Sequence, residues 1–212
     1  MGNRSAIMSL LNYADKIAPS RWNEHESILA AMDLQGDYQK KNLRTVMCAL
    51  DVLGYEFVPE AIVHTAERTG FRGRWEKLSD NPLTICDIGH NEHGLRHNFA
   101  QLTAMKANGQ CSDLIIVYGS VADKDVDSVL HLMPHDATYI FTQAQSKRAL
   151  PADIVYEKYV QERGVSENIH VCPTVAQAVK KAGELAASLG TAPLIYIGGS
   201  TYVVSEAIEL VR

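Results

Sequence analysis

The stretch that decides the fold is Thr84-Ile-Cys-Asp-Ile-Gly-His-Asn-Glu-His-Gly94, an apolar run that ends on Asp87 and turns at Gly89. The segment 82–86 before it is short and β-prone, whereas the apolar residues beyond it recur at helical spacing. The polar cluster is therefore predicted to lie on a strand-to-helix turn. In a parallel α/β sheet, such a turn can bring a carboxylate, an imidazole and helix N–H groups together around a ligand.

From Phe71 onward, strand-like and helix-like segments alternate, which is typical of an α/β fold with a mostly parallel, Rossmann-like sheet flanked by helices. We expect five strands, at 82–87, 113–119, 137–142, 167–172 and 193–198. We expect helices near 93–107, 123–132, 152–163, 174–189 and 201–211. Thr174 and Gln177 form a capping box for the fourth of these helices.

Residues 1–70 show helical patterns and hardly a strand. One amphipathic helix is ended by Gly54, and a second begins at Pro59 and is expected to run to about Arg68. Because helices without a sheet form an incomplete core, their apolar faces are expected to dock onto another surface. We therefore divide the chain into a helical segment, 1–70, and an α/β domain, 71–212.

Composition argues against several classes of function. The net charge is -5 and the 20 Lys and Arg residues are scattered, so we expect no nucleic-acid binding. No stretch reaches the roughly 20 apolar residues of a membrane span, and the start of the sequence lacks the pattern of a secretory signal. The four cysteines lie far apart, without a Cys-x-x-Cys pair, which favours a reducing, cytoplasmic location.

Three polar or glycine-rich turns follow predicted parallel strands. They comprise Asp87 to Asn91, Gly119-Ser120 with the following Asp123-Lys124-Asp125, and Gly198 to Thr201. Parallel strands place their carboxyl ends at one edge of the sheet, so these turns are expected to line one crevice. A purely structural interpretation makes Asp123 a helix N-cap, with Asp125 in the first helical turn, and the glycines tight-turn residues.

Two further features need interpretation. His90, His93 and His97 have the spacing of one helix face, and a Zn²⁺ site is an alternative, but neither a recognised metal spacing nor a cysteine ligand accompanies them, so no metal site is predicted. Arg72 and Arg74 lie where the helical segment meets the α/β domain. The planar donor fork of such an arginine can bind an anion.

These motifs resemble the C-terminal part of folylpolyglutamate and dihydrofolate synthases, in the Mur ligase superfamily. That family typically carries Gly-Arg and then Asp-Gly-Ala-His-Asn-Pro, and this chain has Gly73-Arg74 and then Asp87-Ile-Gly-His-Asn91. The similarity extends over about residues 34–212. It includes further motifs at Gly36-Asp-Tyr-Gln-Lys-Lys-Asn42, Asp123-Lys-Asp125, Phe141-Thr-Gln143 and Gly199-Ser-Thr-Tyr202.

The resemblance implies ATP-dependent ligation of L-glutamate to folate or dihydropteroate through an acyl phosphate, with Mg²⁺ as a cofactor. It identifies 1–70 as the helical tail of a central ATP-binding domain and 71–212 as a C-terminal glutamate-ligase domain. Arg74 and His90 would be catalytic. The implied ligand contacts are Arg74, Asp87 and Asn91 for ATP, His90 and Ser200 for glutamate, and more weakly Lys124.

The sequence departs from the family pattern in two respects. Ile88, Gly89 and Glu92 replace the family's Gly-Ala and Pro, and no Gly-x-x-x-x-Gly-Lys-Ser/Thr phosphate loop occurs. We therefore expect an inactive fragment, whose missing N-terminal part binds most of the ATP and Mg²⁺. The alternatives are a non-catalytic nucleotide- or amino-acid-binding module, an interaction domain that dimerises through 1–70, and a metal-binding protein.

Overall fold

The computed structural model describes residues 26–189 and 192–211. The chain divides into two compact units between Arg72 and Gly73. The first 25 residues of the predicted 1–70 segment lie outside the described residues.

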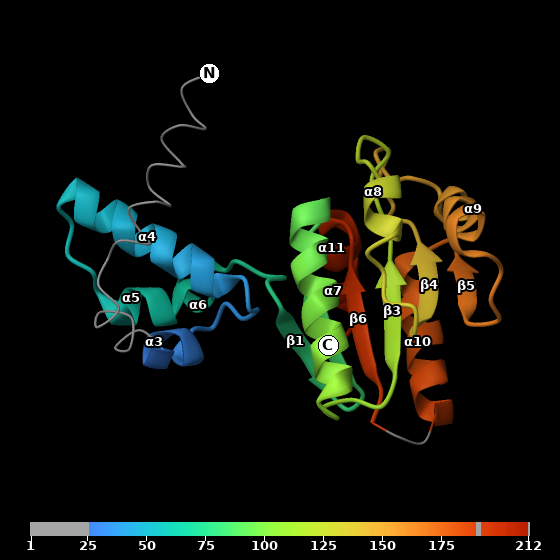
Figure 1. Ribbon diagram of the computed structural model, residues 1–212, viewed down its shortest axis with the longest axis horizontal. Helices are drawn as coiled ribbons and strands as arrows, with labels where there is room; N and C mark the ends of the chain where they lie inside the picture. The colour runs from blue at the N-terminus through green and yellow to red at the C-terminus, as the bar shows by residue number, and fades with distance from the viewer. Residues whose placement is uncertain (1–25, 190–191, 212) are drawn as a thin grey trace. The chain divides into compact units, whose positions relative to one another are not determined.

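The second unit contains a six-stranded sheet with the order β1-β2-β6-β3-β4-β5 (Figure 1). All neighbouring pairs are parallel except β1 and β2. The strands are β1 Glu76–Asp80, β2 Leu83–Asp87, β3 Leu114–Tyr118, β4 Thr138–Thr142, β5 Ile169–Cys172 and β6 Leu194–Gly198. The mostly parallel sheet and its five predicted strands are thus confirmed.

The prediction of five strands missed β1. This strand reads Glu-Lys-Leu-Ser-Asp, without the apolar alternation of a half-buried strand. It forms because it pairs antiparallel with β2, and the register shifts between Lys77 and Ser79. Pairing with a neighbouring strand has overridden a weak local preference.

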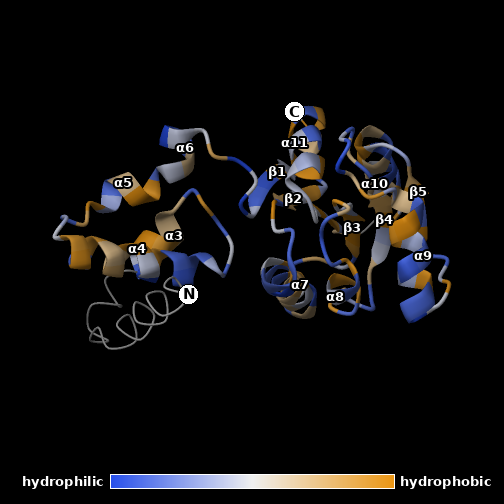
Figure 2. Cartoon of the chain, turned by 90° about the horizontal axis from the view of Figure 1, so that it is seen from above, coloured by the Kyte–Doolittle hydropathy of each residue, from blue (hydrophilic) through white to orange (hydrophobic). Residues whose placement is uncertain are grey.

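Helices cover both faces of the sheet (Figures 1 and 2). α7 Glu92–Ala107, α8 Asp127–Leu130 and α9 Ala152–Arg163 share one core with the sheet, and α10 Val175–Leu189 and α11 Thr201–Leu210 share the other. The first core includes the fully buried side chains of Leu95 and Leu102, and the second those of Val203 and Val204. The Thr174 Oγ1 accepts a hydrogen bond from the Gln177 N–H at 3.3 Å, as its predicted capping role requires.

α8 is shorter than the predicted helix over 123–132. The loop before it pairs with the segment after β4, because the Ala122 N–H donates to the Arg148 carbonyl at 2.8 Å and Val121 forms a β-bridge with Ala149. The Asp125 carboxylate accepts from the Ser128 N–H at 3.1 Å. The purely structural alternative for Asp123 does not hold for this helix, because the N-cap position is Val126 and the carboxylate that accepts from the first turn is that of Asp125.

The described part of the first unit contains α3 Glu26–Ala31, α4 Gln39–Leu53, α5 Pro59–Val63 and α6 Thr65–Thr69, and no strand. α4 ends at Gly54, which has φ 72°, as predicted. The single helix predicted from Pro59 is interrupted at His64, where ψ is 34°. Met32, Leu43 and Met47 form the small core of this unit, whereas Val52 and Leu53 are exposed.

Candidate functional site

The three turns singled out in the sequence begin side by side at one edge of the sheet. Asp87 is the register partner of Gly198 across β2 and β6, and Gly198 is the partner of Tyr118 across β6 and β3. The chain therefore leaves these strands at the same level. The predicted common edge is confirmed, and it brings a carboxylate, glycine backbone and helix N-termini together.

Asp87 organises the first turn. Its side chain is 1% exposed, its Oδ2 accepts from the Trp75 N–H at 2.9 Å, and its Oδ1 accepts from the Gly89 N–H at 2.7 Å and the Asn98 Nδ2 at 2.8 Å. Charge-assisted bonds of this kind stabilise a buried carboxylate. A Cβ atom on Gly89 would lie 2.8 Å from the Asp87 Oδ1, so this position requires glycine.

His90 and Asn91 complete the turn. The Nδ1 of the half-buried His90 lies 3.0 Å from the Ile88 carbonyl oxygen. Since a carbonyl can only accept, this contact assigns a proton to Nδ1, and in the neutral ring it makes Nε2 an acceptor. Asn91 is the N-cap of α7, and its Oδ1 accepts from the Gly94 N–H at 2.8 Å. Asn91 therefore has a structural role as the cap of α7.

Arg74 lies on a strained backbone segment that is hydrogen-bonded to this turn. Gly73 has φ 76° and Trp75 has φ 49°, the one positive φ outside glycine in the described part of the chain. The Ile88 N–H donates to the Gly73 carbonyl at 2.8 Å, and the Trp75 N–H donates to Asp87. Both neighbours of Arg74 are thus held by the Asp87 turn, so the backbone of this half-buried arginine has a defined position.

The turn after β6 presents Ser200 at the start of α11. Gly199 has φ 91°, and Ser200 is 2% exposed and accepts from the Tyr202 N–H at 3.2 Å. Ser200 is therefore an N-cap, whose hydroxyl lies at the positive end of a helix dipole. The third predicted region contains Lys124, which is half-buried in the loop before α8, where its N–H donates to the Val121 carbonyl at 3.2 Å.

An exposed ion pair joins the loop after β3 to the loop after β4. The Arg148 Nη2 lies 2.7 Å from the Asp123 Oδ2. The hydrogen bond from Arg148 is the main cause that lowers the pKa of Asp123 below its ordinary value. The loops after β3 and β4 are therefore connected at the edge that carries the three turns.

Arg148→Ala is expected to raise the pKa of Asp123, because the guanidinium stabilises the ionised carboxylate. The pair's contribution to stability is present above the unfolded pKa of Asp123 and is lost as the pH falls through the lowered folded value. Exposure keeps that contribution small. Carbon-detected NMR titration of Asp123 checks this, with Arg96→Ala as the control because Arg96 pairs with Glu92 instead. An unchanged titration in Arg148→Ala would contradict the ion pair.

Within residues 26–189 and 192–211, no group of three His, Cys, Asp or Glu side chains is arranged to hold a metal ion. The His93 and His97 rings pack edge to face with centroids 5.0 Å apart.

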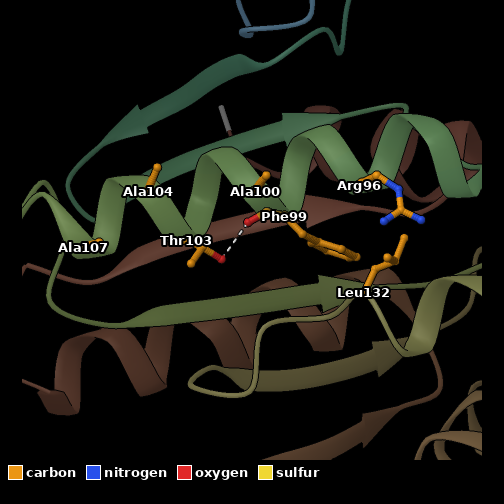
Figure 3. A pocket seen from close by; sticks show the side chains of 7 residues that line it. All are labelled: Arg96, Phe99, Ala100, Thr103, Ala104, Ala107 and Leu132. Carbon is orange, nitrogen blue, oxygen red and sulfur yellow. Dashed lines mark hydrogen bonds between the residues drawn. The ribbon is translucent and has the colours of Figure 1, made fainter.

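A shallow groove of about 490 Å³ lies on α7, away from the three turns, and contains none of the predicted site residues (Figure 3). Its lining consists of Arg96, Phe99, Ala100, Thr103, Ala104, Ala107 and Leu132. The predicted polar site residues lie in the three turns and not in this mostly apolar groove.

Sequence reasoning missed Asn98, Tyr196 and Arg148. A signal existed for Asn98, which interrupts the apolar face of α7 between Leu95 and Phe99 and is fully buried. A buried polar side chain on such a face needs a hydrogen-bond partner. Tyr196 gave no signal, because its strand is apolar throughout.

Comparison with known proteins agrees with the fold and the turns. Over 189 residues, the chain is 24% identical to the probable bifunctional folylpolyglutamate synthase/dihydropteroate synthase of Haloferax volcanii, covering 86% of this chain and 21% of that protein. It is 32% identical over 103 residues to the dihydrofolate synthase/folylpolyglutamate synthase of Buchnera aphidicola, covering 47% and 23%. The chain thus spans less than a quarter of each of these relatives.

A solved structure shares the fold. The Mycobacterium tuberculosis folylpolyglutamate synthase complexed with ADP and AMPPCP superposes with a TM-score of 0.69 at 22% identity, over 85% of this chain and 41% of that one. In the described residues, no helix is long and apolar enough to cross a bilayer. The family described as Mur ligase, glutamate ligase domain matches residues 73–199, which begin at Gly73, include the first two turns and end at Gly199, just before Ser200. The chain therefore belongs to the Mur ligase family.

Proposed function

We propose that this chain supplies the C-terminal part of an ATP-dependent ligase that adds L-glutamate to folate or dihydropteroate through an acyl phosphate. The observation that carries the proposal is that strand register brings the three turns to one edge of the sheet, where the segment with Arg74 is hydrogen-bonded to the first turn. The family match over 73–199 and the names of the relatives support the same reaction class.

The proposed roles follow the chemistry of the side chains. A carboxylate oxygen of the folate substrate attacks the γ-phosphate of ATP, the bond to the β-phosphate breaks and ADP leaves. The glutamate nitrogen then attacks the acyl carbon, displaces phosphate and loses a proton. Arg74 would stabilise charge that develops on the phosphoryl oxygens. Asp87 would act on the nucleotide side by holding Trp75 and Gly89, and therefore Arg74, in place. Asn91 would contact ATP in addition to capping α7.

His90 and Ser200 would hold the incoming glutamate. The His90 Nε2, as an acceptor, suits an ammonium or amine N–H, and the Ser200 hydroxyl at the N-terminus of α11 suits a carboxylate. Lys124 would contribute a second cation at the same edge, more weakly.

ATP and Mg²⁺ would bind mainly to a preceding region of a longer protein, of which 1–70 would be the helical tail. When bound, Mg²⁺ neutralises phosphate charge. Within this chain the half-buried guanidinium of Arg74, at the carboxyl edge of the sheet, fits a phosphate group. The described residues offer no carboxylate cluster that fits the metal. A cytosolic location is part of the same proposal.

The test is ATP-dependent phosphate release with L-glutamate and either dihydropteroate or tetrahydrofolate. We would compare this chain with a form extended upstream in its reading frame, and introduce Arg74→Ala and His90→Ala into the extended form. Only the extended form should turn over, and Arg74→Ala should reduce kcat by at least about 100-fold. Arg96→Ala and His131→Ala are matched controls on α7 and after α8, and both should retain activity.

Two outcomes would overturn the proposal. Turnover by this chain alone would contradict its dependence on a preceding region. An extended form without activity would favour a binding module that uses the same edge without catalysis, and that module must then bind ATP or glutamate unaided.

A further inference from the structure

Two fully buried side chains, those of Asn98 and Tyr196, form a hydrogen-bond network with Asp87. Asn98 on α7 donates from its Nδ2 to the Asp87 Oδ1 and to the Tyr196 hydroxyl, each at 2.8 Å. Tyr196 lies on β6, and both side chains are 0% exposed. The network therefore joins β2, α7 and β6 behind the candidate site.

The geometry fixes the orientation of the Asn98 amide. In this orientation the buried Asn98 Oδ1 has no hydrogen-bond partner among the described residues. If the amide were reversed, however, its Oδ1 would face the Asp87 carboxylate, and two acceptors would repel each other in a buried position while the Nδ2 lost both of its present acceptors. Asn98 therefore presents Nδ2 to Asp87, and the same nitrogen donates its second hydrogen to Tyr196. The Asn98 amide therefore links the Asp87 carboxylate to the Tyr196 hydroxyl.

The Tyr196 ring also limits the turn after β6. A Cβ atom on Gly198 would lie 2.5 Å from the Tyr196 hydroxyl, so the ring fills the space beside this glycine. The rings of Trp75 and Phe99 pack against it with centroids 6.0 and 6.4 Å away. One hydroxyl therefore lies against the Gly198 turn and is linked through Asn98 to the Asp87 turn.

We propose that Asn98 and Tyr196 are positioning residues that hold the Asp87 and Gly198 turns in one fixed relative geometry. Asp87 in turn holds the Gly89 and Trp75 N–H groups by hydrogen bonds, and these residues neighbour His90 and Arg74. The consequence for substrates rests on the proposed ligase function. The positioning itself can be measured in this chain without substrate.

The experiment is amide hydrogen exchange by NMR on the 212-residue chain, comparing Tyr196→Phe with Tyr139→Phe. Both changes remove one hydroxyl from a buried tyrosine of the same core, but the Tyr139 hydroxyl donates to the Pro134 carbonyl instead. Exchange at Gly89 and Trp75 is normalised to Val117 in the central strand β3. In Tyr196→Phe, these two amides should exchange about tenfold faster after normalisation, the loss of one hydrogen bond. In Tyr139→Phe, they should change only with the global stability.

A second variant, Asn98→Leu, should give the same local pattern, and Tyr196→Phe decides alone if Asn98→Leu fails to fold. Equal exchange at Gly89 and Trp75 in the two tyrosine variants would overturn the proposal. In the extended form, Tyr196→Phe should lower kcat/KM about tenfold while Tyr139→Phe retains it. Full activity despite faster local exchange would overturn the positioning role. If the unaltered extended form is inactive, the ligase function fails, and the exchange comparison still decides the positioning role.

Discussion

Gly199→Ala is expected to lower the free energy of unfolding by about 4 kcal/mol. The backbone at Gly199 has φ +91°, where a side chain is strained. The added Cβ atom would also lie 2.4 Å from the Tyr118 ring and 2.7 Å from the Gly119 carbonyl oxygen. That ring is 1% exposed and packs edge to face on Phe141, so it cannot move aside easily.

Variants at two other glycines distinguish backbone strain from steric contact when their stabilities are measured by urea unfolding. Gly109 has φ +73° and no atom near the added Cβ, so Gly109→Ala reports backbone strain alone. Gly183, inside α10, is open and has no positive φ, and Gly183→Ala should be stabilising by roughly 0.5–1 kcal/mol. A loss at Gly199 no larger than the loss at Gly109 would show that the contact with Tyr118 is not tight.

Asp87→Asn is expected to destabilise the chain by about 3 kcal/mol, although the two side chains have nearly the same shape. The carboxylate accepts from the N–H groups of Trp75 and Gly89 and from the Asn98 amide. An asparagine has one acceptor oxygen, so its NH₂ group must face at least one buried donor. The strained Trp75 would lose its anchor or the Gly89 turn would open.

Asp80→Asn is the matched control, since Asp80 lies in the same β1–β2 pairing and its side chain is 83% exposed beside Lys77. It should change stability by less than about 0.5 kcal/mol. Chemical denaturation of both variants checks the difference. Equal stabilities would mean that the three donors find other acceptors, and the central role of Asp87 would be wrong.

The sequence was sufficient for features that depend on local pattern. The apolar run before Asp87, the glycines after it and the helical spacing from Leu95 identified β2, its turn and α7. The same reasoning placed the turns after β3 and β6, and parallel topology then brought all three to one edge. Local pattern and topology agree there, so the prediction was confirmed.

Features that depend on long-range partners could not be predicted in this way. β1 is polar and exists because β2 pairs with it, and the positive φ of Trp75 is held by a carboxylate twelve positions along the chain. The bond from Asn98 to Tyr196 spans 98 positions. Hydrophobic periodicity carries no information about such contacts, although they determine the geometry of the site.

The antiparallel strand β1 also makes its edge of the sheet unfavourable for the addition of a further strand. β2, which carries Asp87, has β1 on one side and β6 on the other, so its backbone is not available to another molecule. The strand at this edge is charged, and its register shifts between Lys77 and Ser79. Charged and irregular edge strands are poor templates for aggregation. A second chain approaching this side of the sheet would meet a polar, irregular strand before it could reach the one that leads into the site.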